Sequence, residues 1–202
     1  MNKNSTIKLL AMAGIAAALT ACGGGDDGGD GGGGGMPVVG QNGTVEVGSV
    51  RMGAGETCGI GNFPQALLAE INKARAQARS CGGQNMPAVP AIAYWNTKLQ
   101  EAAVKHSADM ASKNYFSHTG RDGSEPHDRA AQSGYQGGVG ENLAGAFGGA
   151  HGSAIIGRNM NAWLNSEGHC MNIMSEGWVE VAAACVQNGS KAYTTFMFGS
   201  GQ

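Results

Sequence analysis

The chain has 202 residues and a formal net charge of −2, and 36 of its residues are glycine. No stripe or patch of lysine and arginine appears along it, so we expect no nucleic-acid partner. After a glycine-rich N-terminal part, the remaining length is enough for one domain with a core of its own, and we expect a monomer.

Residues 1–21 have the features of an export signal. Two lysines precede an apolar run at residues 9–19, which is too short to cross a bilayer. The motif Leu19-Thr20-Ala21-Cys22 resembles a bacterial lipobox, which would make Cys22 a lipidated residue that anchors the chain to a membrane. Gly23 follows, where an aspartate would indicate retention at the inner membrane, so we expect an outer-membrane lipoprotein. The alternative is an ordinary secretory signal and a periplasmic or secreted protein.

The segment from residue 22 to residue 56 has little to bury. It contains a tract of glycine with three aspartates, followed by a mixed stretch with scattered valines. Such a composition predicts a flexible tether. The globular domain is then expected over residues 57–202.

Two helices are predicted in the first half of this domain. Apolar residues recur at helical spacing between Pro64 and Arg79, and Cys81-Gly82-Gly83 ends the run. A second helix is predicted to begin at the N-cap Asn96. His106 lies on the apolar stripe of this helix and is therefore predicted to be a core histidine.

Two more helices and a hairpin are predicted in the second half. A short helix follows Ser124, and a long one follows Ser153 with Trp163 as a packing anchor on its inner face. Alternating segments at 178–186 and 192–198 flank Asn188-Gly189, a strong hairpin signal. Helices followed by a terminal hairpin predict an α+β domain with an antiparallel sheet.

Three short motifs carry groups that bind metal or move protons: Phe116-Ser117-His118-Thr119, Gly140-Glu141-Asn142 and Ser166-Glu167-Gly168-His169. Two neutral imidazoles and one carboxylate, with a position left for water, make an open zinc site, and similar sets bind other divalent ions such as magnesium. The alternative is structural: both histidines hydrogen-bond Glu141 and hold three loops together.

With their flanks, and in this order, these motifs resemble the CAP superfamily of cysteine-rich secretory, antigen 5 and pathogenesis-related 1 proteins, especially its bacterial secreted branch. The resemblance spans about residues 64–198 and implies a three-layer α-β-α sandwich. It places His118, Glu141 and His169 on three of four positions that line a cleft with two histidines and two glutamates. Ser166 stands at the fourth position. Glu167, one step later, is a weak candidate because one residue turns a helical side chain by roughly 100°.

The cysteines allow two interpretations. Cys170 follows His169 directly, so an imidazole-activated thiolate nucleophile has to be considered. With Cys22 used for lipid, however, four cysteines remain in an exported chain, where disulfides are the default. Four cysteines allow three pairings. The resemblance, through cysteines that related bacterial chains gain or lose together, favours Cys81 with Cys170 and Cys58 with Cys185.

Three functions from different classes remain open. The first, which we favour, is a cleft that binds a divalent metal (zinc or magnesium) or a small ligand in the cell envelope; the resemblance implies no defined catalytic activity. The second is a metal-dependent hydrolase or peptidase with Glu141 as base. The third is a lipid-binding protein or an interaction scaffold.

Overall fold

The computed structural model describes residues 40, 42–149 and 151–202. The predicted export signal, Cys22 and the glycine-rich residues up to 39 lie outside the described residues. Within the described part, none of the helices combines the length and the apolar character needed to span a membrane.

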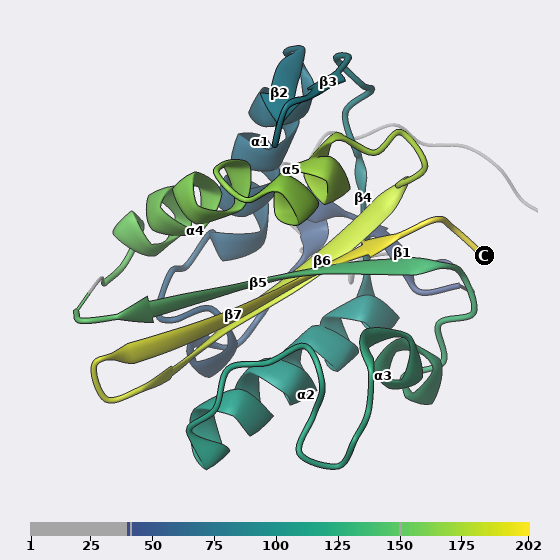
Figure 1. The fold of residues 1–202 in the computed structure, drawn as a ribbon. Helices are drawn as coiled ribbons and strands as arrows, with labels where there is room; N and C mark the ends of the chain where they lie inside the picture. Colours follow the sequence, from purple (N-terminus) through teal and green to yellow (C-terminus); the bar gives the residue numbers. More distant parts are fainter. Residues whose placement is uncertain (1–39, 41, 150) are drawn as a thin grey trace, which may run out of the picture. The chain divides into compact units, whose positions relative to one another are not determined.

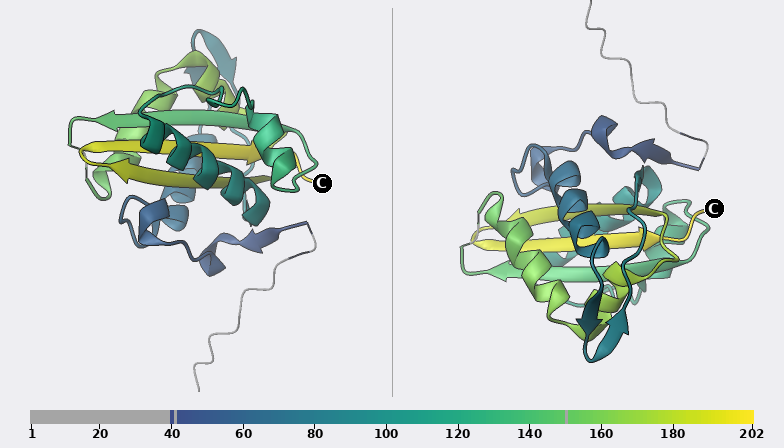
Figure 2. Two further views of the ribbon diagram at one scale, coloured as in Figure 1. Left: turned by 90° about the horizontal axis from the view of Figure 1, so that it is seen from below. Right: turned by 90° about the horizontal axis from the view of Figure 1, so that it is seen from above.

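A five-stranded sheet with the strand order β1-β4-β6-β7-β5 forms the middle layer. Helices α1, α4 and α5 cover one face and α2 and α3 the other (Figures 1 and 2). The strands are β1 (Thr44–Glu46), β4 (Tyr94–Asn96), β5 (Val139–Phe147), β6 (Glu180–Asn188) and β7 (Lys191–Gly199). The helices are α1 (Phe63–Arg75), α2 (Thr97–Lys113), α3 (Pro126–Gln132), α4 (Ala154–Leu164) and α5 (Glu167–Met174). The predicted α+β three-layer sandwich is confirmed.

The sheet is antiparallel except at one place. β6 pairs with β7 and β7 with β5 along their lengths, and the predicted hairpin turns at Gly189, whose φ is +59°. β4 pairs in parallel with β6 over two residues, and β1 adds to the outside of β4. The consequence for the site is that β5 is an edge strand.

The ordered domain begins before Thr57, the start expected from the sequence. β1 and two 3-10 turns, Val47–Ser49 and Ala54–Glu56, occupy part of the segment assigned to the tether. Val45 on β1 is buried opposite Trp95 of β4. A three-residue strand has almost no sequence pattern of its own, because its conformation depends on the strand that it pairs with.

The first helix also differs from its prediction, since α1 ends at Arg75 rather than Arg79. The Arg79 guanidinium donates to the carbonyl of Ala74 and satisfies the end of the helix. The chain then turns into a small hairpin of β2 (Arg79–Cys81) and β3 (Gln84–Met86). Helix α2 begins as predicted, because the Asn96 side chain accepts from the N–H groups of Lys98 and Leu99.

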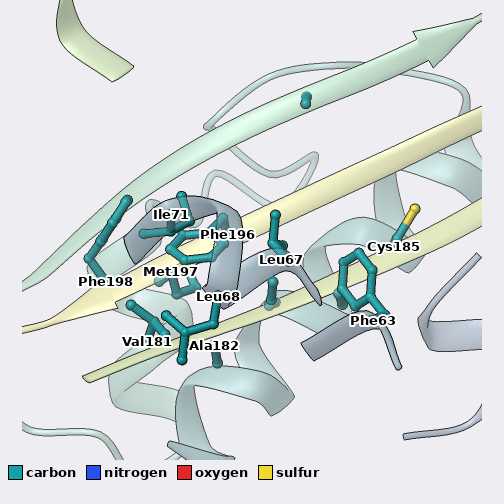
Figure 3. Close-up of a cluster of buried hydrophobic side chains, with 14 of the residues drawn as sticks. Phe63, Leu67, Leu68, Ile71, Val181, Ala182, Cys185, Phe196, Met197 and Phe198 are labelled. Atoms are coloured by element: carbon teal, nitrogen blue, oxygen red, sulfur yellow. The ribbon is translucent and has the colours of Figure 1, made fainter. Parts of the chain in front are cut away.

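The core lies on both faces of β6 and β7. Figure 3 shows side chains of α1 against these strands, with Leu67, Leu68 and Ile71 facing Val181 and Phe196. Ala182, Ala183 and Ala184 of β6 are fully buried. A strand covered on both faces is apolar at consecutive positions, which explains this alanine run. Trp163 is also fully buried, as predicted for a packing anchor.

Two disulfides tie the layers together. Cys58 pairs with Cys185 of β6, and Cys81 of β2 pairs with Cys170 of α5. Both pairs are the ones that the family resemblance favours. Because the sulfur of Cys170 is bonded, the alternative of a thiolate nucleophile at Cys170 is wrong for this structure.

Candidate functional site

Residues from three layers meet at the outer edge of β5. His118 lies in the loop between α2 and α3, on one face of the sheet, and His169 lies on α5, on the other face (Figure 1). Glu141 lies on β5 between them. The edge position of β5 is what allows the two helical layers to reach one another around it.

Strand β5 itself was not expected from the sequence. Four of its nine residues are glycine or alanine, which have low strand propensity, and its conformation comes from nine residue pairs with β7. Gly140 is required by packing, because a Cβ there would lie 2.9 Å from the ring of Trp178.

The Glu141 carboxylate is buried and both of its oxygens are engaged. Its side chain is 1% exposed. Oε1 lies 2.7 Å from Nδ1 of His118, and Oε2 accepts a hydrogen bond of 2.7 Å from the Arg129 guanidinium. A buried carboxylate needs such partners, because desolvation penalises an isolated charge.

Arg129 is a site residue that was not predicted from the sequence. It lies on α3, is 6% exposed, and also donates to the carbonyls of His118 and Ser124 at 2.9 and 2.7 Å. Arg129 therefore fixes the loop that carries His118 as well as the carboxylate that bonds His118. In the sequence it resembles an ordinary surface charge on a short helix, and no local signal separates it from one.

The contact with Glu141 sets the tautomer of His118. A carboxylate that already accepts from Arg129 requires a donor at its other oxygen, so Nδ1 of His118 carries the proton. In the neutral form of the ring, Nε2 is then the nitrogen without a proton. The His118 side chain is 48% exposed, so this ring is open to solvent beside the buried carboxylate.

His169 lies next to His118, with the two ring centroids 6.2 Å apart. Burial lowers the pKa of His169, and the neighbouring His118 lowers it further, so the ring is neutral at neutral pH. The Asn142 amide donates to the backbone carbonyl of His169 at 3.0 Å, and Asn172 donates to Asn142 Oδ1 at 3.0 Å. These contacts hold α5 against β5 and thereby fix where His169 stands.

Glu167 does not join the other three residues. Its side chain is exposed and lies against Gly82 in the β2–β3 turn, where an added Cβ would collide with it. In the described residues it makes no hydrogen bond to His118, Glu141 or His169. The turn of roughly 100° per helical residue accounts for this direction.

The predicted three-ligand set is not formed as such. Among residues 40, 42–149 and 151–202, no three His, Cys, Asp or Glu side chains come together so that they could hold an ion. What the structure brings together is a pair of imidazoles, with Glu141 behind one of them. The alternative in which both histidines hydrogen-bond Glu141 is therefore met by His118 alone. No hydrogen bond links the His169 ring to Glu141 in the described part of the chain.

His106 anchors the loop that carries His118. It is 1% exposed, as predicted for a core histidine, and its Nε2–H donates to the carbonyl of Ser117 at 2.9 Å. Burial lowers its pKa, which keeps the ring neutral. Since Ser117 precedes His118, this bond adds a second anchor to the loop beside that of Arg129.

The geometry argues against Glu141 as a general base. A base needs a free oxygen within reach of the proton that it removes. Both oxygens of Glu141 are bonded and the carboxyl group is buried, so proton transfer to it would break the contact with His118 or with Arg129. The arrangement is suited to orienting His118.

Comparison with known proteins gives a consistent assignment. The family model CAP, described as the cysteine-rich secretory protein family, matches residues 68–199. YkwD of Bacillus subtilis, described as uncharacterized, is 33% identical over 94 residues, which is 46% of this chain and 34% of that protein. The chain thus spans about a third of the curated relative that it matches.

Two solved structures share the fold, and a third is similar over a smaller part of the chain. An outer surface protein from Borrelia burgdorferi is similar with a TM-score of 0.52 and 18% identity, over 68% of this chain and 92% of that one. NaASP2, solved with Zn²⁺, has a TM-score of 0.52 and 17% identity, over 76% of this chain and 85% of that one. An extracellular SCP-domain protein from Bacillus anthracis is 28% identical with a TM-score of 0.46, over 55% of this chain and 34% of that one.

Proposed function

Because the chain belongs to the CAP family, the cysteine-rich secretory proteins, we propose that it binds a divalent cation between His118 and His169. Glu141 then acts as a positioning residue and not as a ligand. The bound ion would keep open positions for water or for a small envelope ligand. This proposal keeps the two histidines of the sequence prediction and changes the role of the carboxylate.

One observation carries the proposal, namely the 2.7 Å contact between Nδ1 of His118 and the buried carboxylate of Glu141. Metal-binding histidines usually donate their second ring N–H to a carboxylate or a carbonyl, which fixes the tautomer and makes the other nitrogen more basic. His118 has this arrangement, with an exposed ring and a carboxylate that is itself held by Arg129.

His169 suits the role of second ligand. Metal binding requires a neutral imidazole, and the lowered pKa of His169, caused first by burial and then by His118, supplies it at neutral pH. The disulfide from Cys81 to the adjacent Cys170 holds this turn of α5. Both imidazoles are therefore supported by rigid neighbours before any ion binds, as a tight site requires.

Zinc is the first ion to test. Imidazole nitrogen suits zinc, whereas magnesium prefers oxygen ligands and keeps much of its water. Of the structural relatives, NaASP2 was solved with Zn²⁺. When bound, zinc would supply a Lewis acid in the cleft; the residues of this chain would hold it at His118 and His169 and would keep His118 oriented through Glu141.

Isothermal titration of Zn²⁺ into the full chain at neutral pH tests the proposal. We expect one site that is lost in His118→Ala and in His169→Ala, and unchanged in His127→Ala, whose side chain is 74% exposed on α3 and serves as the matched control. Glu141→Gln should weaken binding about tenfold to a hundredfold while the ligands stay in place. Absence of Zn²⁺ uptake, or equal uptake in His118→Ala and His127→Ala, would refute the proposal.

We also propose that the domain is exported and is anchored to the outer membrane through lipid on Cys22. The support is the lysine-initiated apolar run before Cys22 and the lipobox-like motif that ends with it. One structural relative is described as an outer surface protein. Labelled fatty acid should enter the expressed chain and should be absent from Cys22→Ser; label in Cys22→Ser, or none in the parent chain, would contradict the anchor.

A further inference from the structure

A second feature lies at one end of the sheet, where α2 ends, β5 ends and β7 begins (on the left in Figure 1). Four aromatic side chains gather there, Tyr115, Phe116, Phe147 and Tyr193, which we call the aromatic ridge. The ring centroids of Phe116 and Phe147 are 5.8 Å apart, and those of Phe147 and Tyr193 are 5.4 Å apart, both edge to face. Phe116 is 46% exposed and Phe147 is 48% exposed, which is unusual for large apolar side chains.

The ridge separates two hollows. One has a volume of about 310 Å³ and is lined by Asn114, Tyr115, Phe116, Phe147, Lys191 and Tyr193. The other has a volume of about 450 Å³ and is lined by Tyr115, Phe116, Ser117, Thr119, Gly120 and Arg121. Tyr115 and Phe116 therefore present aromatic surface to both hollows, and each hollow has polar groups on its other wall.

The charged side chains that line the two hollows are positive. No carboxylate lines either of them, and their charged groups are Lys191 in the first and Arg121 in the second. The Arg121 guanidinium lies over the Tyr115 ring, 4.8 Å from its centroid. Within the described residues neither cation forms an ion pair.

Hydrogen bonding in the first hollow also favours an acceptor ligand. Oδ1 of Asn114 accepts from Lys191 Nζ at 2.6 Å and from the Tyr193 hydroxyl at 3.3 Å. The acceptor side of this amide is therefore engaged, and the group that it can offer to a ligand is the Nδ2 donor. Aromatic walls with a few fixed donors and a cation are the composition of a ligand site rather than of an ordinary surface.

We propose that the aromatic ridge binds an acidic polysaccharide that carries carboxylates. The C–H faces of sugar rings pack on Tyr115, Phe116 and Phe147. The carboxylates pair with Lys191 and Arg121, and hydroxyl groups accept from the Asn114 amide. The charge complementarity and the aromatic side chains that line both hollows carry this choice of ligand.

The same features disfavour a membrane as the occupant. Basic segments that bind anionic lipid typically carry about 4–8 lysines and arginines, whereas the ridge has two cations.

Titration of the full chain with a polyuronate hexamer, in low salt and in the presence of a chelator, tests the proposal without the metal site. A neutral glucan hexamer is the matched ligand control. We expect Phe116→Ala to weaken polyuronate binding about tenfold and Lys191→Gln about threefold. Binding should also weaken as salt is raised, because exposed charges are screened.

Two substitutions elsewhere control for loss of an aromatic ring or of a charge. Tyr94→Ala removes a ring that is 46% exposed on β4, and Lys73→Gln removes an exposed charge on α1; both should bind as the parent chain does. Equal affinity for the neutral glucan and the polyuronate would overturn the proposal. So would absence of polyuronate binding, or Phe116-dependent binding to anionic lipid vesicles without binding to polyuronate.

Discussion

Replacing Arg129 by methionine tests how the site is held together. The side chains of Arg129 and Glu141 are 7% and 1% exposed, so the substitution leaves a buried carboxylate with one partner. It also removes the bonds to the carbonyls of His118 and Ser124. Breaking a buried ion pair by removing one partner costs about 3–5 kcal/mol, and the loss of two further bonds to carbonyls favours the upper part of that range.

The assay is urea unfolding followed by tryptophan fluorescence, with the slope m compared between variants. We expect a fall of about 3–5 kcal/mol in the free energy of unfolding for Arg129→Met. The double variant Arg129→Met, Glu141→Met should be more stable than Arg129→Met alone, because the orphan carboxylate is then absent. A loss below about 1 kcal/mol for Arg129→Met, or additive effects in the double variant, would refute the argument that this pair organises the loop.

The remaining predictions concern pH and the buried end of β6. Burial lowers the pKa of His106 in the folded chain, so the unfolded chain takes up a proton at a higher pH than the folded chain does. The free energy of unfolding should therefore be highest above about pH 6.5 and fall as the pH drops below it, and this fall should be smaller in His106→Gln. Urea midpoints of both chains at about pH 7.5 and about pH 5.5 test this. Asn96→Ala removes the cap of α2 and the 2.9 Å bond to Glu180, and should cost about 2–4 kcal/mol. Asn96→Asp keeps the oxygen that caps α2 but places a carboxylate beside Glu180. A thermal midpoint equal to that of the parent chain would show that only the cap, and not the bond to Glu180, contributes to stability.

Local signals in the sequence predicted the elements that local interactions make. Asn96 caps α2 because an asparagine side chain can reach the N–H groups of its own helix, and Asn188-Gly189 turns the hairpin because glycine accepts a positive φ. His106 and Trp163 were placed correctly in the core, since helical periodicity assigns faces. The disulfide pairs came from the family resemblance, since sequence alone allows three pairings.

What could not be predicted depends on long-range contacts. β5 is a strand because β7 pairs with it, although four of its nine residues are glycine or alanine and its sequence has no clear strand pattern. Glu180 of β6 is buried and accepts from Thr44, Asn96 and Tyr135, which come from distant parts of the chain, so its partners are not visible in the local sequence.

The role of Glu141 is a further case. The sequence suggested a ligand, but Arg129 and His118 occupy both oxygens, and neither contact is visible without the fold.

A crystal structure of the chain soaked with Zn²⁺, with the ion located by its anomalous signal, would show directly whether the two histidines hold zinc. We expect one ion bonded to Nε2 of His118 and to a ring nitrogen of His169, with Glu141 still on Nδ1 of His118 and on Arg129. An ion coordinated by the Glu141 carboxylate, or zinc bound elsewhere on the protein and not at His118 and His169, would refute the proposed site.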